Sequence, residues 1–349
     1  MPRMPRLDIP GQFYHVIIRG IERCPIFRTD MDRIDFLKRF TSGLLDTGAQ
    51  CFAWALMNNH VHLLLLNGVE GLAALMQPLL TGYAGTFNRK YNRVGHLFQN
   101  RYKAILCEAE PYFLELIRYI HLNPVRAGII HSLFELARFP WTGHSALMGV
   151  IPRPWQVLDD VLNQFGSTVG TARHGYEQFM QDRWNEGYRR DLEGGGLIRS
   201  MGGMANALSA LRAGQRQAFD ARILGSGEFV ESILRASEKK DEQRLTIQQS
   251  GWSLENLEQW VAQWAGVPPE TLIQADRRRK VSKARALSVY AATEWLDRSS
   301  REMAERYQCS TGSICEARQR GRHWANELDL AATLALPYPH HNKQRSLTF

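Results

Sequence analysis

The chain has 349 residues, of which 44% are hydrophobic and 22% are charged, as in an ordinary soluble protein long enough for two domains. Its formal net charge of +8 favours a polyanionic partner, and nucleic acid is the first candidate. The five cysteines are odd in number and form no Cys-x-x-Cys pair, which argues against a disulfide framework or a structural zinc site.

The N-terminus has no apolar signal core, and no apolar run approaches the roughly 18 residues that span a bilayer. We therefore expect a cytoplasmic, nucleoid-associated protein with no membrane partner.

The first 120 residues alternate between strand and helix patterns. Strands are predicted over residues 12–19, 50–57, 59–66 and 101–108. A helix with an apolar stripe follows the first strand and ends near Gly48, and a second, with a kink at Pro78, follows the third. The first stripe comprises Ile34, Leu37, Phe40, Leu44 and Leu45, widened by Phe36. This order predicts an α+β fold with a ferredoxin-like antiparallel sheet that carries its helices on one face and leaves the other available for a site.

Two histidines stand out in the third strand. Alternate residues of a strand face opposite sides, so His60 and His62 project from one face while Val61, Leu63 and Leu65 project from the other. Two neutral imidazoles on one face suit a shared metal ion. The pattern alone also fits a half-exposed strand whose histidines bind nothing.

A tyrosine and an asparagine follow on a predicted helix that Pro111 opens. In that helix Tyr119 and Asn123 lie one turn apart, so that a phenol and an amide point to one site. Tyr112 is the rival nucleophile, but it has no amide partner at the same spacing.

These motifs together resemble the single-tyrosine transposases that use a His-hydrophobe-His metal site, and within them the REP-associated tyrosine transposases. The resemblance rests on His60, His62 and the run from Tyr119 to Gly128, with added matches from Phe13 to Gly20 and from Gly95 to Lys103, and covers roughly the first 150 residues. Asn123 stands where glutamine is usual in the broader group, but it fits the REP-associated branch.

The resemblance implies a site and a reaction. Tyr119 would attack a phosphate of single-stranded or hairpin DNA of the REP type, leaving a 5′-phosphotyrosine and a free 3′-hydroxyl. His60, His62 and Asn123 would hold Mg²⁺ or Mn²⁺, and imidazole ligands favour the softer Mn²⁺. The enzyme would act as a monomer or a homodimer.

Other residues of this region carry weaker predictions. His15, His96 and His121 could assist proton transfer, but single histidines without a partner are more often structural. Five cations are candidate phosphate contacts or ordinary surface charge, namely Arg19, Arg101, Lys103, Arg118 and Arg126.

The sequence indicates four segments. We expect a transposase domain over residues 1–165, whose last part wraps the domain edge, and a connector over 166–219 marked by the glycines at 194–196 and 202–203. A helical DNA-binding domain follows over 220–328, and residues 329–349, with His340 and His341, read as a flexible tail.

The helical domain contains a basic region and a predicted helix-turn-helix. Ser299 and Glu302 fit a capping box before a short helix, and a turn at residues 308–310 leads to a second helix that begins before Ile314. This segment is similar to the DNA-binding domain of the bacterial replication initiator, although it lacks the turn glycine at Gln308 and the Asp-His before Thr311. The alternative is a helical packing domain with a solvated basic face. Candidate DNA contacts are Arg277, Arg278, Arg279, Lys280, Lys283 and Arg285 for phosphates, and Thr311, Ser313, Arg318 and Arg320 for base edges.

The sequence therefore predicts a DNA nicking and rejoining enzyme with a second DNA-binding domain. Two alternatives stay open: a DNA-binding regulator that keeps the fold without the reaction, and a metal-dependent RNA endonuclease that uses bound water. Cleavage of DNA would exclude the first alternative, and a covalent protein-DNA adduct would exclude the second.

Overall fold

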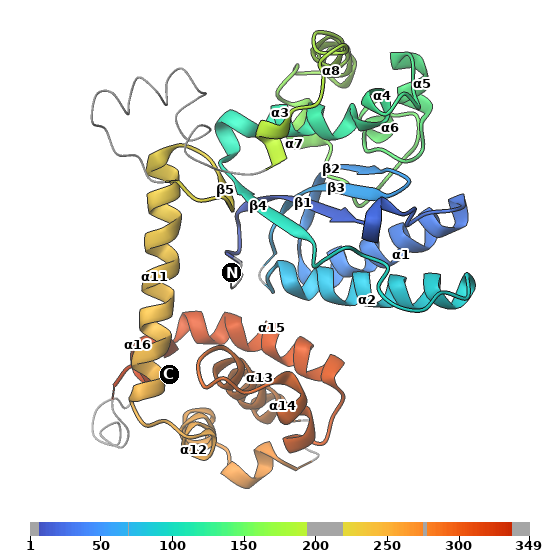
Figure 1. Cartoon of the computed structure of the whole chain (residues 1–349). Coiled ribbons are helices and arrows are strands. Elements are labelled where there is room, and N and C mark those ends of the chain that lie inside the picture. The colour runs from blue at the N-terminus through green and yellow to red at the C-terminus, as the bar shows by residue number, and fades with distance from the viewer. Residues whose placement is uncertain (1–6, 69, 194–218, 275–277, 337–349) are drawn as a thin grey trace. The chain divides into compact units, whose positions relative to one another are not determined.

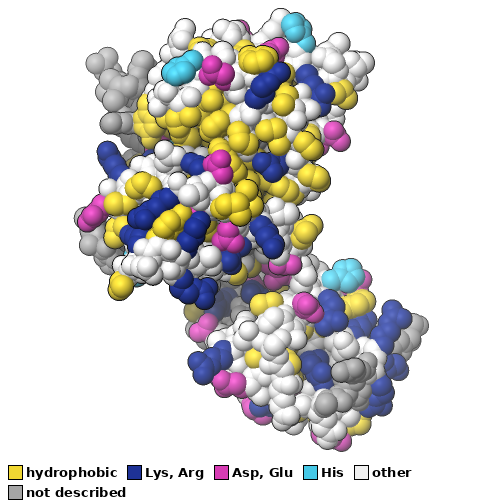
Figure 2. Space-filling view, turned by 90° about the vertical axis from the view of Figure 1, so that its right-hand side faces the viewer, with side chains coloured by type: hydrophobic (Ala, Val, Ile, Leu, Met, Phe, Trp, Pro, Cys, Tyr) yellow, Lys and Arg dark blue, Asp and Glu magenta, His cyan; other side chains and the backbone are white. Residues whose placement is uncertain are grey.

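The computed structural model describes residues 7–68, 70–193, 219–274 and 278–336. The chain divides into two compact units, Met1–Leu234 and Arg235–Phe349, each treated by itself below (Figure 1). On the face drawn in Figure 2, basic and acidic side chains are interspersed. The predicted glycine-rich stretches at 194–203 and the pair His340 and His341 lie outside the described residues. Within the described ranges, no helix has both the length and the apolar character needed to cross a membrane.

The first unit begins with the predicted alternation of strands and helices. Its elements are β1 (Phe13–Arg19), η1 (Ile21–Arg23), α1 (Asp30–Thr47), β2 (Gln50–Leu56), β3 (His60–Leu66), α2 (Leu72–Lys90), β4 (Lys103–Cys107), α3 (Ala109–His121), α4 (Asn123–Arg126), α5 (Leu133–Arg138), α6 (His144–Leu147), α7 (Asp159–Leu162), α8 (Val169–Gln181), η2 (Arg190–Glu193) and β5 (Ile223–Leu224). The helix α11 (Gly227–Gln249) begins in this unit and ends in the second.

The sheet has the strand order β2-β3-β1-β4-β5. The first four strands pair antiparallel, and the order of β1, α1, β2, β3, α2 and β4 confirms the ferredoxin-like α+β fold. β5 adds a short strand parallel to β4, with Leu106 N donating to Arg222 O at 2.8 Å. No sequence pattern indicates β5, because a two-residue strand has no periodicity to detect.

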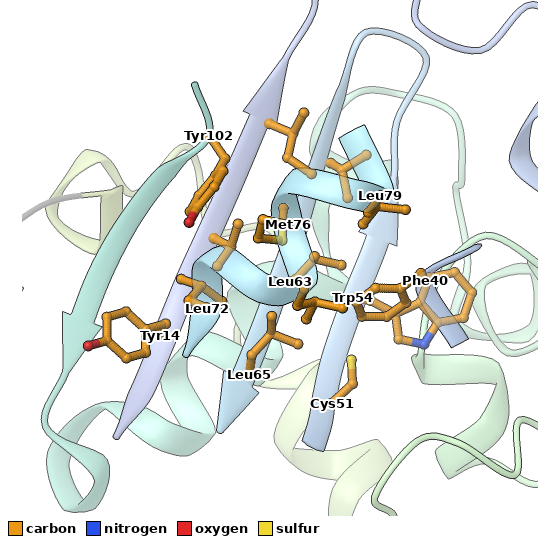
Figure 3. Close-up of a cluster of buried hydrophobic side chains, with 14 of the residues drawn as sticks. Tyr14, Phe40, Cys51, Trp54, Leu63, Leu65, Leu72, Met76, Leu79 and Tyr102 are labelled. Atoms are coloured by element: carbon orange, nitrogen blue, oxygen red, sulfur yellow. The ribbon is translucent and has the colours of Figure 1, made fainter. Parts of the chain in front are cut away.

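One face of the sheet packs against α1 and α2. Tyr14, Leu63 and Leu65 project from the strands into the same core as Leu72 and Met76 of α2 (Figure 3). The capping box of Thr29 and Asp32 starts α1, and Gly48 ends it in the left-handed conformation at φ 67°. The predicted stripe was wrong at its edges, since Ile34 is 48% exposed and Leu45 is 79% exposed.

The other face of the sheet is also covered, which we had not expected. Its core contains Ile17 and Leu64 from the strands and Leu116, Ile117 and Ile120 from α3, together with residues of α8 such as Tyr176 and Met180. The helix α8 and the turn η2 therefore belong to the first unit, whereas we had expected a connector from residue 166. The segment expected to wrap the edge does so, because β2 forms isolated bridges to Thr142 and Gln156.

The second unit is helical. It contains the rest of α11, α12 (Leu254–Ala265), η3 (Pro269–Leu272), α13 (Arg279–Glu294), α14 (Ser300–Arg306), α15 (Thr311–Glu327) and α16 (Leu330–Leu334). The helices α13 and α15 cross closely at Gly321, where a Cβ would lie 1.9 Å from Ala286 O. Leu330 and Leu334 are buried in this core, so the predicted tail from residue 329 is wrong up to residue 336.

Candidate active site and nucleic-acid interface

The sheet register brings the predicted site residues to one face. In the ladder of β1 and β3, Arg19 lies opposite His60, and Ile17 lies opposite His62. In the ladder of β1 and β4, Ile17 also lies opposite Lys103. Residues opposite each other in a ladder share a face, so two histidines and two cations from three strands face the side that α3 covers.

A chain of hydrogen bonds fixes the tautomer of His62. Leu192 O can only accept, so His15 Nδ1, 3.0 Å away, carries a proton. Burial lowers the pKa of His15 to about 4, and the neutral ring therefore has a lone pair on Nε2. That lone pair accepts a hydrogen bond from His62 Nδ1 at 2.9 Å. The free Nε2 of His62 consequently carries a lone pair as well.

A second arrangement does the same for His60. Asn59 Nδ2 donates to Arg23 O at 3.0 Å, which fixes the orientation of the amide. The amide oxygen then lies 2.7 Å from His60 Nδ1 and can only accept, so that Nδ1 carries the proton. His60 Nε2 is left with its lone pair. The two ring centroids are 5.1 Å apart.

Both histidines have the chemistry of metal ligands. Burial, and then the charge of Arg19, lower the pKa of His60 to about 4; burial, then the neighbouring His15 and His60, lower the pKa of His62 well below its ordinary value. A neutral imidazole whose Nδ1–H is held by a neighbour is the usual form of a metal-bound histidine. In the described residues, no group of three or more His, Cys, Asp and Glu side chains is placed to hold a metal ion. The donor set therefore fits a divalent metal that takes its remaining ligands from an amide, water or substrate oxygens.

Tyr119 lies beside this pair on the last turns of α3. Its ring centroid is 5.8 Å from that of His62, and its hydroxyl donates to Glu193 Oε1 at 3.0 Å. Burial, and then the charge of Glu193, raise the pKa of Tyr119, so the phenol is protonated at neutral pH. The guanidinium of Arg126 lies 4.4 Å from the ring centroid and donates to Tyr119 O.

Asn123 follows Tyr119 by one turn but begins the separate helix α4. Its amide nitrogen donates to Tyr119 O and to Ile120 O, each at 3.1 Å, and so closes the C-terminal end of α3. These bonds use the nitrogen, and they do not use the oxygen that the resemblance assigns to the metal. The role of Asn123 as a ligand stays a prediction.

Glu193 is the site residue that sequence reasoning missed. It ends η2, its carboxylate binds Arg19 at 3.0 Å, and Oε1 lies 4.0 Å from His62 Nε2. Its main-chain oxygen accepts from Lys103. No motif surrounds Glu193, and a stretch of 73 residues separates it from Tyr119, so only the tertiary fold brings them together.

The predicted phosphate contacts of the first unit fall into two groups. Arg19, Arg101 and Lys103 line one pocket with Ile17, Gln99, Asn100 and Glu193. Arg118 is buried, donates to Phe179 O at 3.1 Å and pairs with Glu115, so its prediction as a phosphate contact was wrong and its role is structural.

The other candidate catalytic residues of the first unit lie in different environments. Tyr112 is half-buried against the core beneath α3. His96 is exposed, whereas His121 is buried and hydrogen bonded to Tyr176 at 2.8 Å. His15 orients His62, which is a more specific role than the one its lone position in the sequence indicated.

The second unit contains the predicted pair of helices joined by a turn. The capping box of Ser299 and Glu302 starts α14, and Gln308 adopts φ 50° in the turn before α15. Ala304 and Ile314 are buried in one core, as expected. On α15, Thr311, Ser313 and Arg320 are exposed.

The predicted cations of the second unit are only partly available to DNA. Arg278, Arg279 and Lys280 are exposed, and Arg277 lies outside the described residues. Lys283 Nζ lies 4.9 Å and 3.6 Å from the ring centroids of Trp264 and Trp324, and Arg285 donates to the carbonyl oxygens of Thr271, Leu272 and Gln274, so both stabilise the fold. Arg318 pairs with Glu294 at 3.0 Å. The prediction that Lys283 and Arg285 contact phosphates was therefore wrong.

A ferredoxin-like sheet with two paired histidines beside a tyrosine of α3 is the arrangement expected of a tyrosine transposase domain, the class of enzyme that nicks and joins DNA. Residues 10–123 match the model of the family described as Transposase IS200 like. A solved structure, described as that of the REP-associated tyrosine transposase bound to a REP hairpin, is similar over 48% of this chain and 93% of that one, with 14% identity and a TM-score of 0.35. None of the curated proteins matches the chain. The likeness of the second unit to the replication initiator stays a prediction.

Proposed function

We propose that the protein is a metal-dependent endonuclease that nicks and rejoins single-stranded DNA beside REP-type hairpins. Tyr119 attacks the scissile phosphate, the bond to the 3′-oxygen breaks, and the strand stays attached as a 5′-phosphotyrosine. The leaving oxygen takes a proton and becomes a 3′-hydroxyl, while the phenol loses its own. Reversal of the same step joins strands.

The observation that carries the proposal is the fixed tautomer of both histidines. His60 and His62 each direct a bare Nε2 to the face where Tyr119 lies, because Asn59 and His15 hold their Nδ1–H groups. A structural histidine pair has no need of two free lone pairs beside a phenol. A bound Mn²⁺ or Mg²⁺, with Asn123 as the third protein ligand, would polarise a phosphate oxygen and stabilise the charge that develops there.

Arg126 has a supporting part in this reaction. Its cation lies over the face of Tyr119, and its Coulomb interaction lowers the pKa of the phenol against the effect of burial. Arg19 and Lys103 would bind phosphate oxygens at and beside the cleaved bond.

The proposal is tested with hairpin oligonucleotides that carry a labelled single-stranded flank. Wild-type protein with Mn²⁺ is expected to yield a covalent adduct on a denaturing gel, and Tyr119→Phe is expected to yield none while binding the oligonucleotide normally. Tyr112→Phe is the matched control on the same helix and should keep the adduct. His60→Ala and His62→Ala should both abolish it, as should excess chelator. Adduct of normal yield from Tyr119→Phe overturns the assignment, and cleavage without any adduct favours attack by water.

We also propose that the second unit binds the duplex stem of the hairpin. The exposed Arg278, Arg279 and Lys280 would contact phosphates, and Thr311, Ser313 and Arg320 would contact base edges. Replacing the three cations by alanine should weaken binding to all stems alike and reduce the salt dependence by about one unit of slope per lost contact. Lys239→Ala, an exposed cation of α11, is the control. If the triple variant has the affinity and the salt slope of the wild type, the proposal that this surface binds DNA is wrong.

A further inference from the structure

Glu193 makes contacts that a DNA phosphate would need. Its carboxylate accepts from Arg19 Nη2 at 3.0 and 3.2 Å and from the Tyr119 hydroxyl at 3.0 Å. The same carboxylate lies 4.0 Å from the Nε2 of His62. One anionic group therefore touches the nucleophile and a cation of the pocket, and it lies near a histidine nitrogen that is bare.

These are the requirements of a scissile phosphodiester. An attacking oxygen must approach the phosphorus to roughly 3–3.5 Å before reaction, which brings the phosphate oxygens beside the phenol. An arginine fork recognises carboxylate and phosphate oxygens through the same geometry. A phosphate bound for attack by Tyr119 thus needs the volume and the donors that Glu193 uses.

Burial alone would raise the pKa of Glu193, but the hydrogen bond from Tyr188 and the charge of Arg19 outweigh it and hold that pKa below its ordinary value. The group is therefore an anion at neutral pH. Its ion pair with Arg19 is held by the segment that contains η2, which is anchored where Leu192 O binds His15 and where the main-chain oxygen of Glu193 binds Lys103.

We propose that the Glu193 carboxylate occupies the position of the scissile phosphate in the DNA-free enzyme, so that DNA must displace it from Arg19 and Tyr119 to bind. That the group which displaces Glu193 is a phosphodiester rests on the proposed function. The contacts assign the phosphate site to the region between Arg19, Tyr119 and His62. They also make substrate affinity depend on the fraction of molecules in which Glu193 has moved away.

The test measures binding of a short unstructured single-stranded oligonucleotide to the full-length chain in excess chelator, where no cleavage occurs. Glu193→Gln keeps the shape of the side chain but removes its charge, and it should tighten binding roughly tenfold, because one charge-assisted hydrogen bond no longer competes. Glu193→Ala should act in the same direction. Glu186→Gln removes the same charge from the same segment, but Glu186 pairs with Arg183 and Arg189, so this control should bind like the wild type.

Two further measurements separate competition from a general structural effect. The logarithm of affinity should fall more steeply with the logarithm of salt in Glu193→Gln, by about 0.7 units for one added phosphate contact. Arg19→Ala should weaken binding more in the Glu193→Gln background than in the wild type, because Arg19 is then free for DNA.

Unchanged or weaker binding by Glu193→Gln, with the wild-type salt slope, overturns the inference. Absence of any covalent adduct from both proteins after Mn²⁺ is restored would instead overturn the proposed function and leave the binding result intact. An adduct with no gain in affinity would reject the inference alone.

Discussion

Removing the Asn59 side chain should weaken metal binding, although Asn59 is not a metal ligand. Its amide oxygen holds the Nδ1–H of His60 at 2.7 Å and so keeps the lone pair on Nε2. Losing such a partner typically costs 10- to 100-fold in metal affinity. His60 and Asn59 are both partly exposed, so water can replace the amide oxygen, and we expect the lower end, about tenfold, for Asn59→Ala.

The assay is a titration of Mn²⁺ into the full-length protein, followed by the electron paramagnetic resonance signal of the free ion. Asn58→Ala is the matched control, since the side chain of this neighbouring asparagine accepts a hydrogen bond from Arg33 at 2.6 Å. Equal Mn²⁺ affinity for Asn59→Ala and Asn58→Ala would refute the reasoning from tautomers. Loss of Mn²⁺ affinity in both variants would instead show that the turn between β2 and β3 had been disturbed.

Three predictions concern stability. His144 is buried and neutral, and burial lowers its pKa to about 3, so its contribution to stability is complete above pH 6.5 and is lost as the pH falls towards 3. The free energy of urea unfolding should therefore fall between pH 7 and pH 5 by about 2 kcal/mol less in His144→Gln than in the wild type. An equal fall in the two proteins would contradict this. Gly321→Ala should destabilise the second unit by about 3 kcal/mol because of the contact with Ala286 O. Gly312→Ala on the same helix should not, because the nearest atom there is 3.7 Å away. Equal melting temperatures for the two variants would contradict the close crossing of α13 and α15. A chain that ends at residue 220 lacks β5 and the buried Val230 and should melt roughly 5 to 10 °C below one that ends at residue 249, and equal melting temperatures would show that β5 adds no stability.

Local patterns predicted the parts of the site that lie on single elements. The alternation in β3 placed His60 and His62 on one face, because a strand side chain has no other choice once the opposite residues are buried. The helical spacing before Asn123 likewise brought Tyr119 to the covered side of the sheet. In both cases the information lies within a few residues.

Contacts between distant segments could not be predicted in this way. Glu193 reaches Tyr119 from a stretch that reads as a connector, and His15 orients His62 across the ladder of β1 and β3. Charge alone was also insufficient to predict DNA contacts, because a sequence does not distinguish a cation that binds DNA from one that binds carbonyl oxygens. Arg285 and Arg118 are of the second kind.

The position of the covalent bond tests the central claim most directly. After reaction with a REP-type hairpin and Mn²⁺, the protein is treated with nuclease and trypsin, and the peptides are analysed by mass spectrometry. Trypsin cuts after Arg118, so Tyr112 and Tyr119 lie on different peptides. The account predicts a nucleotide attached through phosphate to the peptide that begins at Tyr119. A nucleotide on the peptide that contains Tyr112, or cleaved DNA with no modified peptide, would contradict it.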